Sequence, residues 1–219
     1  FITALGSGIY EAWNIAIEAA GESVQYLTNF NVDDRRHPLC LDVQADILKT
    51  FPNRQLVVTD YLYFFTPKES IVDLYEENHA NGTQIPVINK RTIVYRNLPH
   101  SIPMWRHSLH SPQDCGLFDK SYRSAGDADV WYRVCQRHED PAEVVSIPLS
   151  LYYNNPSGLS TRPATAGKWE HKICSDPHYL QLMDEIDIAL PESFVAAHCQ
   201  RTDAEHLQLF AALSAIQQP

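Results

Sequence analysis

The sequence lacks the features that would tie a chain to a membrane or to nucleic acid. None of its apolar runs approaches the roughly 18 residues that a membrane-spanning helix needs. Its 17 Lys and Arg are outnumbered by 27 Asp and Glu, for a formal net charge of −10. Nucleic acids and anionic membranes attract clustered positive charge, so we expect neither as a main partner. The sequence also has no G-K-[ST] phosphate loop, no internal repeat and no low-complexity segment.

Cysteine pairs are missing as well. The five cysteines are widely spaced, odd in number and never arranged as C-x-x-C, which favours free thiols in a reducing compartment. We therefore expect a cytoplasmic protein that acts in the cytosol or at the cytosolic face of a membrane. The sequence shows no signal-peptide pattern and begins with Phe, so we expect it to be part of a longer or multidomain polypeptide.

The composition is that of a globular protein with a hydrophobic core, with 44% hydrophobic and 20% charged residues. Periodicity and turn signals predict strands at 1–5, 24–30, 55–63, 92–95 and 144–153. They predict helices at 9–20, 38–51, 128–137 and 176–190, and a last helix that a capping box opens at 202–205. Strand, helix and strand in succession imply parallel pairing, and ligands of such sheets bind at the carboxyl ends of the strands.

A polar cluster, N-V-D-D at 31–34, follows the expected strand at 24–30. Two adjacent carboxylates at the end of a buried strand repel each other, and a hard divalent cation is the leading candidate to neutralise them. The alternative is a solvated turn that caps the next helix. Taken alone, Asp33 and Asp34 favour the turn, and the other motifs of the chain shift the balance towards a metal site.

Four motifs stand in a fixed order: G-S-G-I-Y-E-A-W-N at 6–14, N-V-D-D at 31–34, G-L-F-D-K-S-Y-R-S-A-G-D-A-D-V-W-Y-R at 116–133, and P-L-S-L-Y-Y-N-N-P-S-G-L-S-T at 148–161. Together they resemble the family 2 glycosyltransferases, an inverting family with the GT-A fold. In that family a G-x-Y-x-A-x-N segment opens a helix, and a strand ends in a metal motif of the D-x-D type. A G-x-F-D segment then leads to an acidic pair before a W-x-R helix.

The resemblance implies an α/β fold, a GT-A-like (Rossmann-like) mixed sheet flanked by helices. This domain would occupy residues 1–165 and would lack the N-terminal segment with which the family binds the nucleotide base. Residues 166–219 would form a helical C-terminal extension. A sheet without its first strands exposes an apolar edge, which again leads us to expect a longer protein or a partner that covers the edge.

The implied activity is inverting transfer of a sugar from a nucleotide-diphosphate donor to a glycan or lipid-linked acceptor. By resemblance, Mg²⁺ or Mn²⁺ bound by Asp33 and Asp34 would stabilise the leaving group. Asn31 stands at the first position of the metal motif, where Asp is commoner, and suits a hydrogen bond to ribose or sugar better. Asp127 matches the catalytic base, although the family often has Glu-Asp where this chain has Gly126-Asp127.

The same motifs supply the remaining candidate site residues. The donor-binding candidates are Gly8, Tyr10, Asn14, Asn31 and Arg162. The acceptor-binding candidates are Trp105, Arg106, His107, Asp129 and Trp131. Plainer alternatives exist: Asp127 as the N-cap of its helix, Asp129 as a charge at the helix N-terminus, and Trp131 as a core residue.

Other functions stay open beside glycosyl transfer. A non-catalytic GT-A-like remnant could serve as a glycan-binding or scaffolding module, and a metal-dependent phosphohydrolase or nucleotidyltransferase could use the same Asp pair. The spacings His107-x-x-His110 and His171-x-x-Cys174-x-x-x-His178 allow zinc, but no second cysteine pair completes either set.

Overall fold

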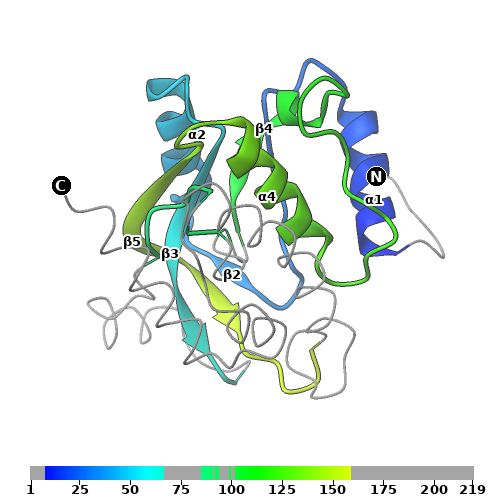
Figure 1. Ribbon diagram of the computed structural model, residues 1–219. Coiled ribbons are helices and arrows are strands. Elements are labelled where there is room, and N and C mark those ends of the chain that lie inside the picture. The colour runs from blue at the N-terminus through cyan, green and yellow to red at the C-terminus, as the bar shows by residue number, and fades with distance from the viewer. Residues whose placement is uncertain (1–7, 67–84, 91, 94–98, 100–101, 159–219) are drawn as a thin grey trace, which may run out of the picture.

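The computed structural model describes residues 8–66, 85–90, 92–93, 99 and 102–158 (Figure 1). The helices of this part are α1 (Ile9–Ala20), α2 (Cys40–Thr50), the 3-10 helix η1 (His107–His110) and α4 (Gly126–Arg137). Its strands are β1 (Tyr26–Thr28), β2 (Arg35–Arg36), β3 (Leu56–Phe64), β4 (Met104–Arg106) and β5 (Ala142–Tyr153). The expected strand at 1–5, both helices after 165 and the expected domain boundary there lie outside the described residues.

The five strands form one curled mixed sheet in the order β1-β4-β3-β5-β2. β3 and β5 are parallel, and the other three pairings are antiparallel. The expected parallel pairing between strands at 1–5 and 24–30 lies outside the described residues, and within them β1 pairs with β4, which runs the opposite way. Arg36 of β2 donates to the Thr28 hydroxyl and the Asn29 carbonyl, so the curl brings the two edge strands into contact.

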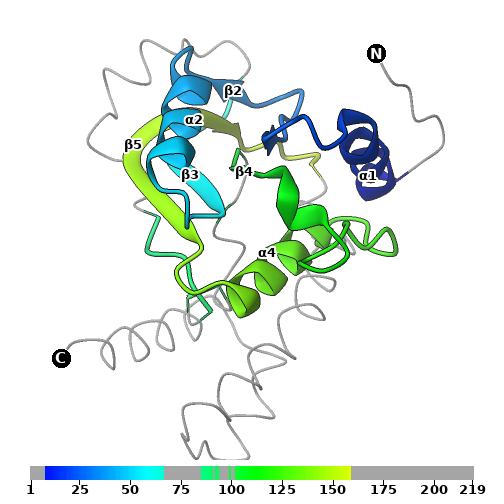
Figure 2. The ribbon, with the colours of Figure 1, turned by 90° about the horizontal axis from the view of Figure 1, so that it is seen from above.

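Helices cover both faces of the sheet. Figure 2 shows α2 on one side of β3 and β5 and α4 on the other. Successive residues of β3 point to opposite faces: Val57 packs with Leu48 of α2, whereas Leu56 and Val58 join the cluster that contains Trp131 of α4. Burial on both faces explains why the sequence of β3 is almost continuously apolar.

The helices begin close to the expected positions. α1 spans the expected 9–20 and ends at Gly21, which has a φ of 68° that glycine adopts without strain. α4 begins two residues before the expected start, so Asp127 lies inside its first turn. The alternative of Asp127 as an N-cap is therefore wrong, because Ala125 occupies that position. α2 begins at Cys40 rather than at 38.

The strands divide by length. β3 and β5 confirm the expected strands at 55–63 and 144–153, with ends shifted by one or two residues. β2 and β4 have two and three residues, too few to show a periodic pattern. Thr92 and Ile93 lie in a turn, so the expected strand at 92–95 is wrong for these two described residues.

No described helix is both long enough and apolar enough to span a membrane.

Candidate active site

The candidate site lies at one end of the sheet, where β3 and β5 both end. The first turns of α1 and α4 lie at this end as well (Figure 1). The loop at 29–34 reaches it too, because the Asp34 side chain binds the backbone of Tyr153, the last residue of β5. The carboxyl ends of parallel strands are where ligands of α/β sheets bind, so the fold brings three of the sequence motifs to the expected place.

Asp127 is half-buried in the first turn of α4 and faces Tyr10 of α1. The Tyr10 hydroxyl donates a hydrogen bond of 3.0 Å to Oδ1 of Asp127. Burial, followed by the charge of Asp127, raises the pKa of Tyr10 above its ordinary value. The hydroxyl therefore keeps its proton and acts as a donor that orients the carboxylate.

Gly126 makes this contact possible. A Cβ atom at this position would lie 2.8 Å from Cδ2 and 2.9 Å from Cε2 of the Tyr10 ring, well inside van der Waals contact. The ring occupies the space that a larger residue would need.

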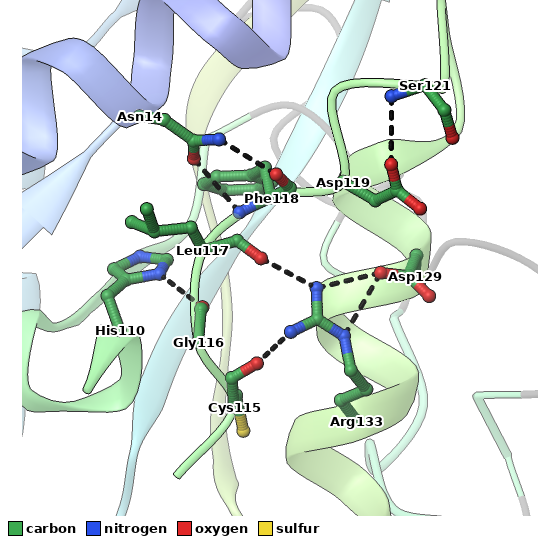
Figure 3. A network of polar contacts seen from close by, with 10 residues as sticks. All are labelled: Asn14, His110, Cys115, Gly116, Leu117, Phe118, Asp119, Ser121, Asp129 and Arg133. Carbon is green, nitrogen blue, oxygen red and sulfur yellow. Dashed lines mark hydrogen bonds and ion pairs between the residues drawn. The ribbon is translucent and has the colours of Figure 1, made fainter. Parts of the chain in front are cut away.

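The donor-binding candidates lie in different settings. The Asn14 amide donates to the carbonyl of Phe118 at 2.8 Å and accepts from its N–H at 2.9 Å, so it fastens the G-L-F-D segment to α1 (Figure 3). The ring of Tyr10 stacks on that of Phe118, with centroids 5.8 Å apart. Gly8 is the exposed N-cap of α1, and Arg162 lies outside the described residues.

Asp129, a candidate for acceptor binding, forms an ion pair within α4. Its Oδ2 accepts from Arg133 at 2.7 Å, one helical turn later. Arg133 also donates to the backbone carbonyls of Cys115 and Leu117, as Figure 3 shows. Asp129 therefore aligns the guanidinium that ties the loop before Phe118 to the helix.

Asp34 is the buried member of the acidic pair, with 5% of its surface exposed. Its Oδ1 accepts from the backbone N–H of Tyr153 at 3.0 Å, and its Oδ2 accepts from Nδ2 of Asn31 at 2.9 Å. Burial raises the pKa of Asp34 to about 6, although both hydrogen bonds oppose the rise. The carboxylate fastens the loop to the end of β5, which makes it less suited to bind a metal ion.

Asp33 is exposed and lies beside the loop that follows β5. Its Oδ2 is 3.5 Å from Nδ2 of Asn155. Mg²⁺ and Mn²⁺ take oxygen ligands, commonly one or two carboxylates completed by water and substrate phosphates. An exposed carboxylate at the end of the sheet fits this donor set, so Asp33 is the better of the two candidate metal ligands.

The two candidate tryptophans are core residues. Trp105 is 3% exposed and Trp131 is 1% exposed, and their rings meet edge to face with centroids 5.3 Å apart. Trp105 also donates from Nε1 to Nε2 of His110 at 2.8 Å. The expectation that these two side chains bind the acceptor is wrong, because each ring is enclosed by the sheet and its helices. The alternative of Trp131 as a core residue is confirmed.

Arg106 and His107 lie towards the opposite end of the sheet, where β3 begins. Arg106 donates to the carbonyl of Leu48 at 2.6 Å and so caps the C-terminal turn of α2. His107 has Nε2 3.3 Å from the carbonyl of Ile17. The ring nitrogens of His110 contact Trp105 and a backbone carbonyl, so the H-x-x-H spacing forms no zinc site in the described structure.

An aromatic cluster at the site end of the sheet went unnoticed in the sequence. Tyr63 of β3 is paired with Tyr152 of β5, and their ring centroids are 5.7 Å apart. Tyr61 contacts both rings, and Tyr63 remains 41% exposed. The sequence signal that could have revealed this cluster is the spacing of Tyr61 and Tyr63, which are two residues apart and so lie on the same face of β3. Such rings present the apolar faces on which sugars and bases stack.

No protein-family model and no curated protein matches the sequence. Solved structures of S. aureus TarS are similar to it. TarS 1–349 gives a TM-score of 0.54 at 15% identity, over 99% of this chain and 55% of that chain. Another TarS structure gives a TM-score of 0.52 at 13% identity, over 94% of this chain and 30% of that chain. TarS 1–349 in complex with UDP gives a TM-score of 0.50 at 14% identity, over 94% of this chain and 50% of that chain.

The chain therefore spans about half the length of TarS 1–349. At this low identity, the likeness speaks for the fold alone. Together with the curled mixed sheet and its flanking helices, it shows that the chain has the GT-A-like glycosyltransferase fold expected from the motifs.

Proposed function

We propose that the protein is an inverting glycosyltransferase that moves a sugar from a nucleotide-diphosphate donor to a glycan or lipid-linked acceptor. One observation carries the proposal: Tyr10 holds the Asp127 carboxylate in the first turn of α4, at the carboxyl end of β3 and β5. The GT-A-like fold supports it, and the UDP complex of TarS supports a nucleotide-linked donor.

Asp127 is the general base of the proposed reaction. It accepts the proton of the acceptor hydroxyl while that oxygen forms a bond to the anomeric carbon of the donor sugar. The bond from this carbon to the diphosphate oxygen breaks, and its electron pair leaves with the nucleoside diphosphate. Attack comes from the face opposite the leaving group, so the configuration at the anomeric carbon inverts. The Tyr10 hydroxyl keeps the carboxylate oriented for the proton transfer.

Asp33 is the proposed ligand of a Mg²⁺ or Mn²⁺ ion at the diphosphate. When bound, such an ion offsets the negative charge that develops on the leaving group. Asp34 positions Asp33 instead of binding the ion itself, because it fastens the loop to Tyr153 and so holds Asp33 at the end of the sheet. Tyr63 and Tyr152 supply a stacking surface for a sugar or base in place of the two buried tryptophans.

Release of nucleoside diphosphate tests the proposal. The chain is mixed with Mn²⁺, a panel of nucleotide sugars and glycan acceptors. We expect Asp127→Asn to lower kcat by about 10² to 10⁴-fold, because the amide cannot take up the proton. Asp33→Ala should abolish the stimulation by Mn²⁺. Asp46→Asn is the matched control, since this α2 carboxylate is 73% exposed and pairs only with Lys49 in the described contacts.

Three outcomes contradict the proposal. Release that is unchanged in both Asp127→Asn and Asp33→Ala would remove the assigned roles. No release from any donor, with no thermal stabilisation by UDP or GDP, would favour the non-catalytic glycan-binding or scaffolding module instead. Cleavage of the donor without any acceptor would favour a phosphohydrolase.

A further inference from the structure

A cluster of one carboxylate, one thiol and one imidazole lies at the other end of α4. Asp114 and Cys115 belong to the loop after η1, and His138 directly follows α4. Nε2 of His138 is 2.9 Å from Oδ1 of Asp114, and the Cys115 thiol donates to the same oxygen at 3.2 Å. One ligand atom from each residue lies within 4.8 Å of the other two.

The surrounding fold holds these three side chains together. Arg133 donates to the Cys115 carbonyl, and Arg137 donates to the Gln113 carbonyl at 3.1 Å, so α4 fastens the loop on both sides of Asp114. In Figure 3 the Cys115 carbonyl points towards Arg133, whereas its sulfur points away from that network. The sulfur is therefore directed to a different neighbourhood from the polar contacts that support the candidate active site.

The donor set suits zinc. A borderline-soft ion binds thiolate, imidazole nitrogen and carboxylate oxygen together, whereas Mg²⁺ and Ca²⁺ prefer oxygen alone. Tetrahedral zinc at its usual bond lengths separates neighbouring ligand atoms by about 3.4 to 3.6 Å. The distances of 2.9 and 3.2 Å in the cluster are a few tenths of an ångström shorter, so small side-chain movements open room for the ion.

Access from solvent is also present. The Asp114 and His138 side chains are 24% and 25% exposed, whereas Cys115 is buried at 5%. An ion can enter from the exposed side and keep water as its fourth ligand. Without an ion, burial and the neighbouring Asp114 raise the pKa of Cys115 to about 12, which speaks against a role as a free nucleophile.

We infer that Asp114, Cys115 and His138 form a zinc site that ties the loop after η1 to the C-terminal end of α4. The site is separate from the ion proposed at Asp33. His138 lies roughly 16 Å along the helix axis from Asp127, so the inference does not depend on the proposed function. Zinc here stabilises α4, whose first turn carries the proposed base.

Cobalt substitution tests the site directly. The full chain is stripped with a chelator and titrated with Co²⁺ alone, then with Zn²⁺ in competition. We expect one equivalent of Co²⁺ per chain with a thiolate-to-cobalt charge-transfer absorption in the near ultraviolet, and Zn²⁺ should displace it. An ion bound only by carboxylates gives no such band, so the measurement distinguishes this site from the one proposed at Asp33.

Variants identify the ligands. Cys115→Ser should abolish the charge-transfer band, and His138→Gln should weaken Zn²⁺ binding by more than about tenfold, since even indirect support of a ligand is worth that much. Cys135→Ser and Cys40→Ser are the matched controls, because both thiols are buried but neither belongs to the cluster. These control variants should keep the band.

Stability provides a second readout. Zn²⁺ should raise the thermal unfolding midpoint of the wild-type chain and of the control variants, but not that of the ligand variants. If Cys115→Ser does not fold, His138→Gln decides, because its side chain is partly exposed and Gln can still donate to Asp114. A charge-transfer band that persists in Cys115→Ser, or stoichiometric Co²⁺ binding without any such band, would overturn the inference.

Discussion

The candidate site has a helix side and a loop side, and they are built differently. On the helix side, formed by the first turns of α1 and α4, the ring of Tyr10 is 3% exposed and its hydroxyl binds Asp127. On the loop side, residues 31–34, Val32 is fully exposed and Asp34 alone is buried. One side is packed from two helices, whereas the buried tie of the other side to the sheet, among the described contacts, is the Asp34 carboxylate.

The difference matches the chemistry proposed for each side. A group that takes up a proton must be held in one orientation before the substrate arrives, and packing between two helices provides this. A carboxylate that shares an ion with a leaving group must instead be reached from solvent. The exposure of Asp33 meets this requirement, and Asp34 provides the fixed point behind it.

The largest expected effect on stability concerns the loop side. The pKa of Asp34 is about 6 in the folded protein and 3.8 ordinarily, so folding disfavours the ionised carboxylate. Its contribution to the free energy of unfolding is fully present below pH 3.8 and is lost as the pH rises through 6. The loss is on the order of 3 kcal/mol. Denaturant unfolding in the presence of a chelator, at several pH values, measures it.

Two variants sharpen this measurement. Asp34→Asn cannot ionise, so its unfolding free energy should vary less between pH 4 and pH 6 than that of the wild type. Asp33→Asn removes the smallest of the contributions to the Asp34 pKa shift and should keep most of the wild-type dependence. Equal pH dependence in the wild type and Asp34→Asn would mean that Asp34 is not the buried anchor of the loop.

The next effect concerns the packing of the helix side. Gly126→Ala places a methyl group against the Tyr10 ring, which should cost about 2 kcal/mol and lower kcat by displacing the ring from Asp127. Gly8→Ala is the matched control for stability, because no atom lies within 4 Å of that Cβ and its φ of −66° suits alanine. Thermal unfolding measures both variants, and donor turnover measures Gly126→Ala against the wild type. Equal losses in the two variants would rule out the close approach as the cause.

The smallest effect isolates one hydroxyl. Tyr10→Phe keeps the ring on Phe118 and removes only the donor to Asp127, so it should cost about 1.5 kcal/mol of stability and part of kcat. Tyr26→Phe is the control, since its ring lies under Arg106 without a hydroxyl contact in the described structure. If the two variants unfold alike and turn over alike, the hydroxyl does not orient the carboxylate.

The longer elements could be predicted because their signals are local. α1 repeats its apolar positions over three turns and stops at Gly21, and in β3 every residue of the nine except Asp60 is apolar, aromatic or β-branched. β2 and β4 could not be predicted, because two or three residues become a strand only when a distant strand pairs with them.

The candidate site shows the same division. Asp33 and Asp127 stood out because they belong to motifs that resemble those of a known family, one after an expected strand and the other before an expected helix. The role of Asn14 did not, because its partner Phe118 is 104 residues away in the chain. The cluster of Asp114, Cys115 and His138 escaped notice for the same reason, since no short spacing unites the three residues.

Local signals are enough to predict the main helices, the two long strands and the acidic motifs, because periodicity, turn residues and charge act on near neighbours. The exposure of Asp33, the burial of Asp34 and the core positions of Trp105 and Trp131 depend on tertiary contacts. Burial depends on which distant segments pack against a residue. Two adjacent aspartates therefore differ in burial and contacts because one of them meets the end of β5, and burial raises the pKa of that one, Asp34.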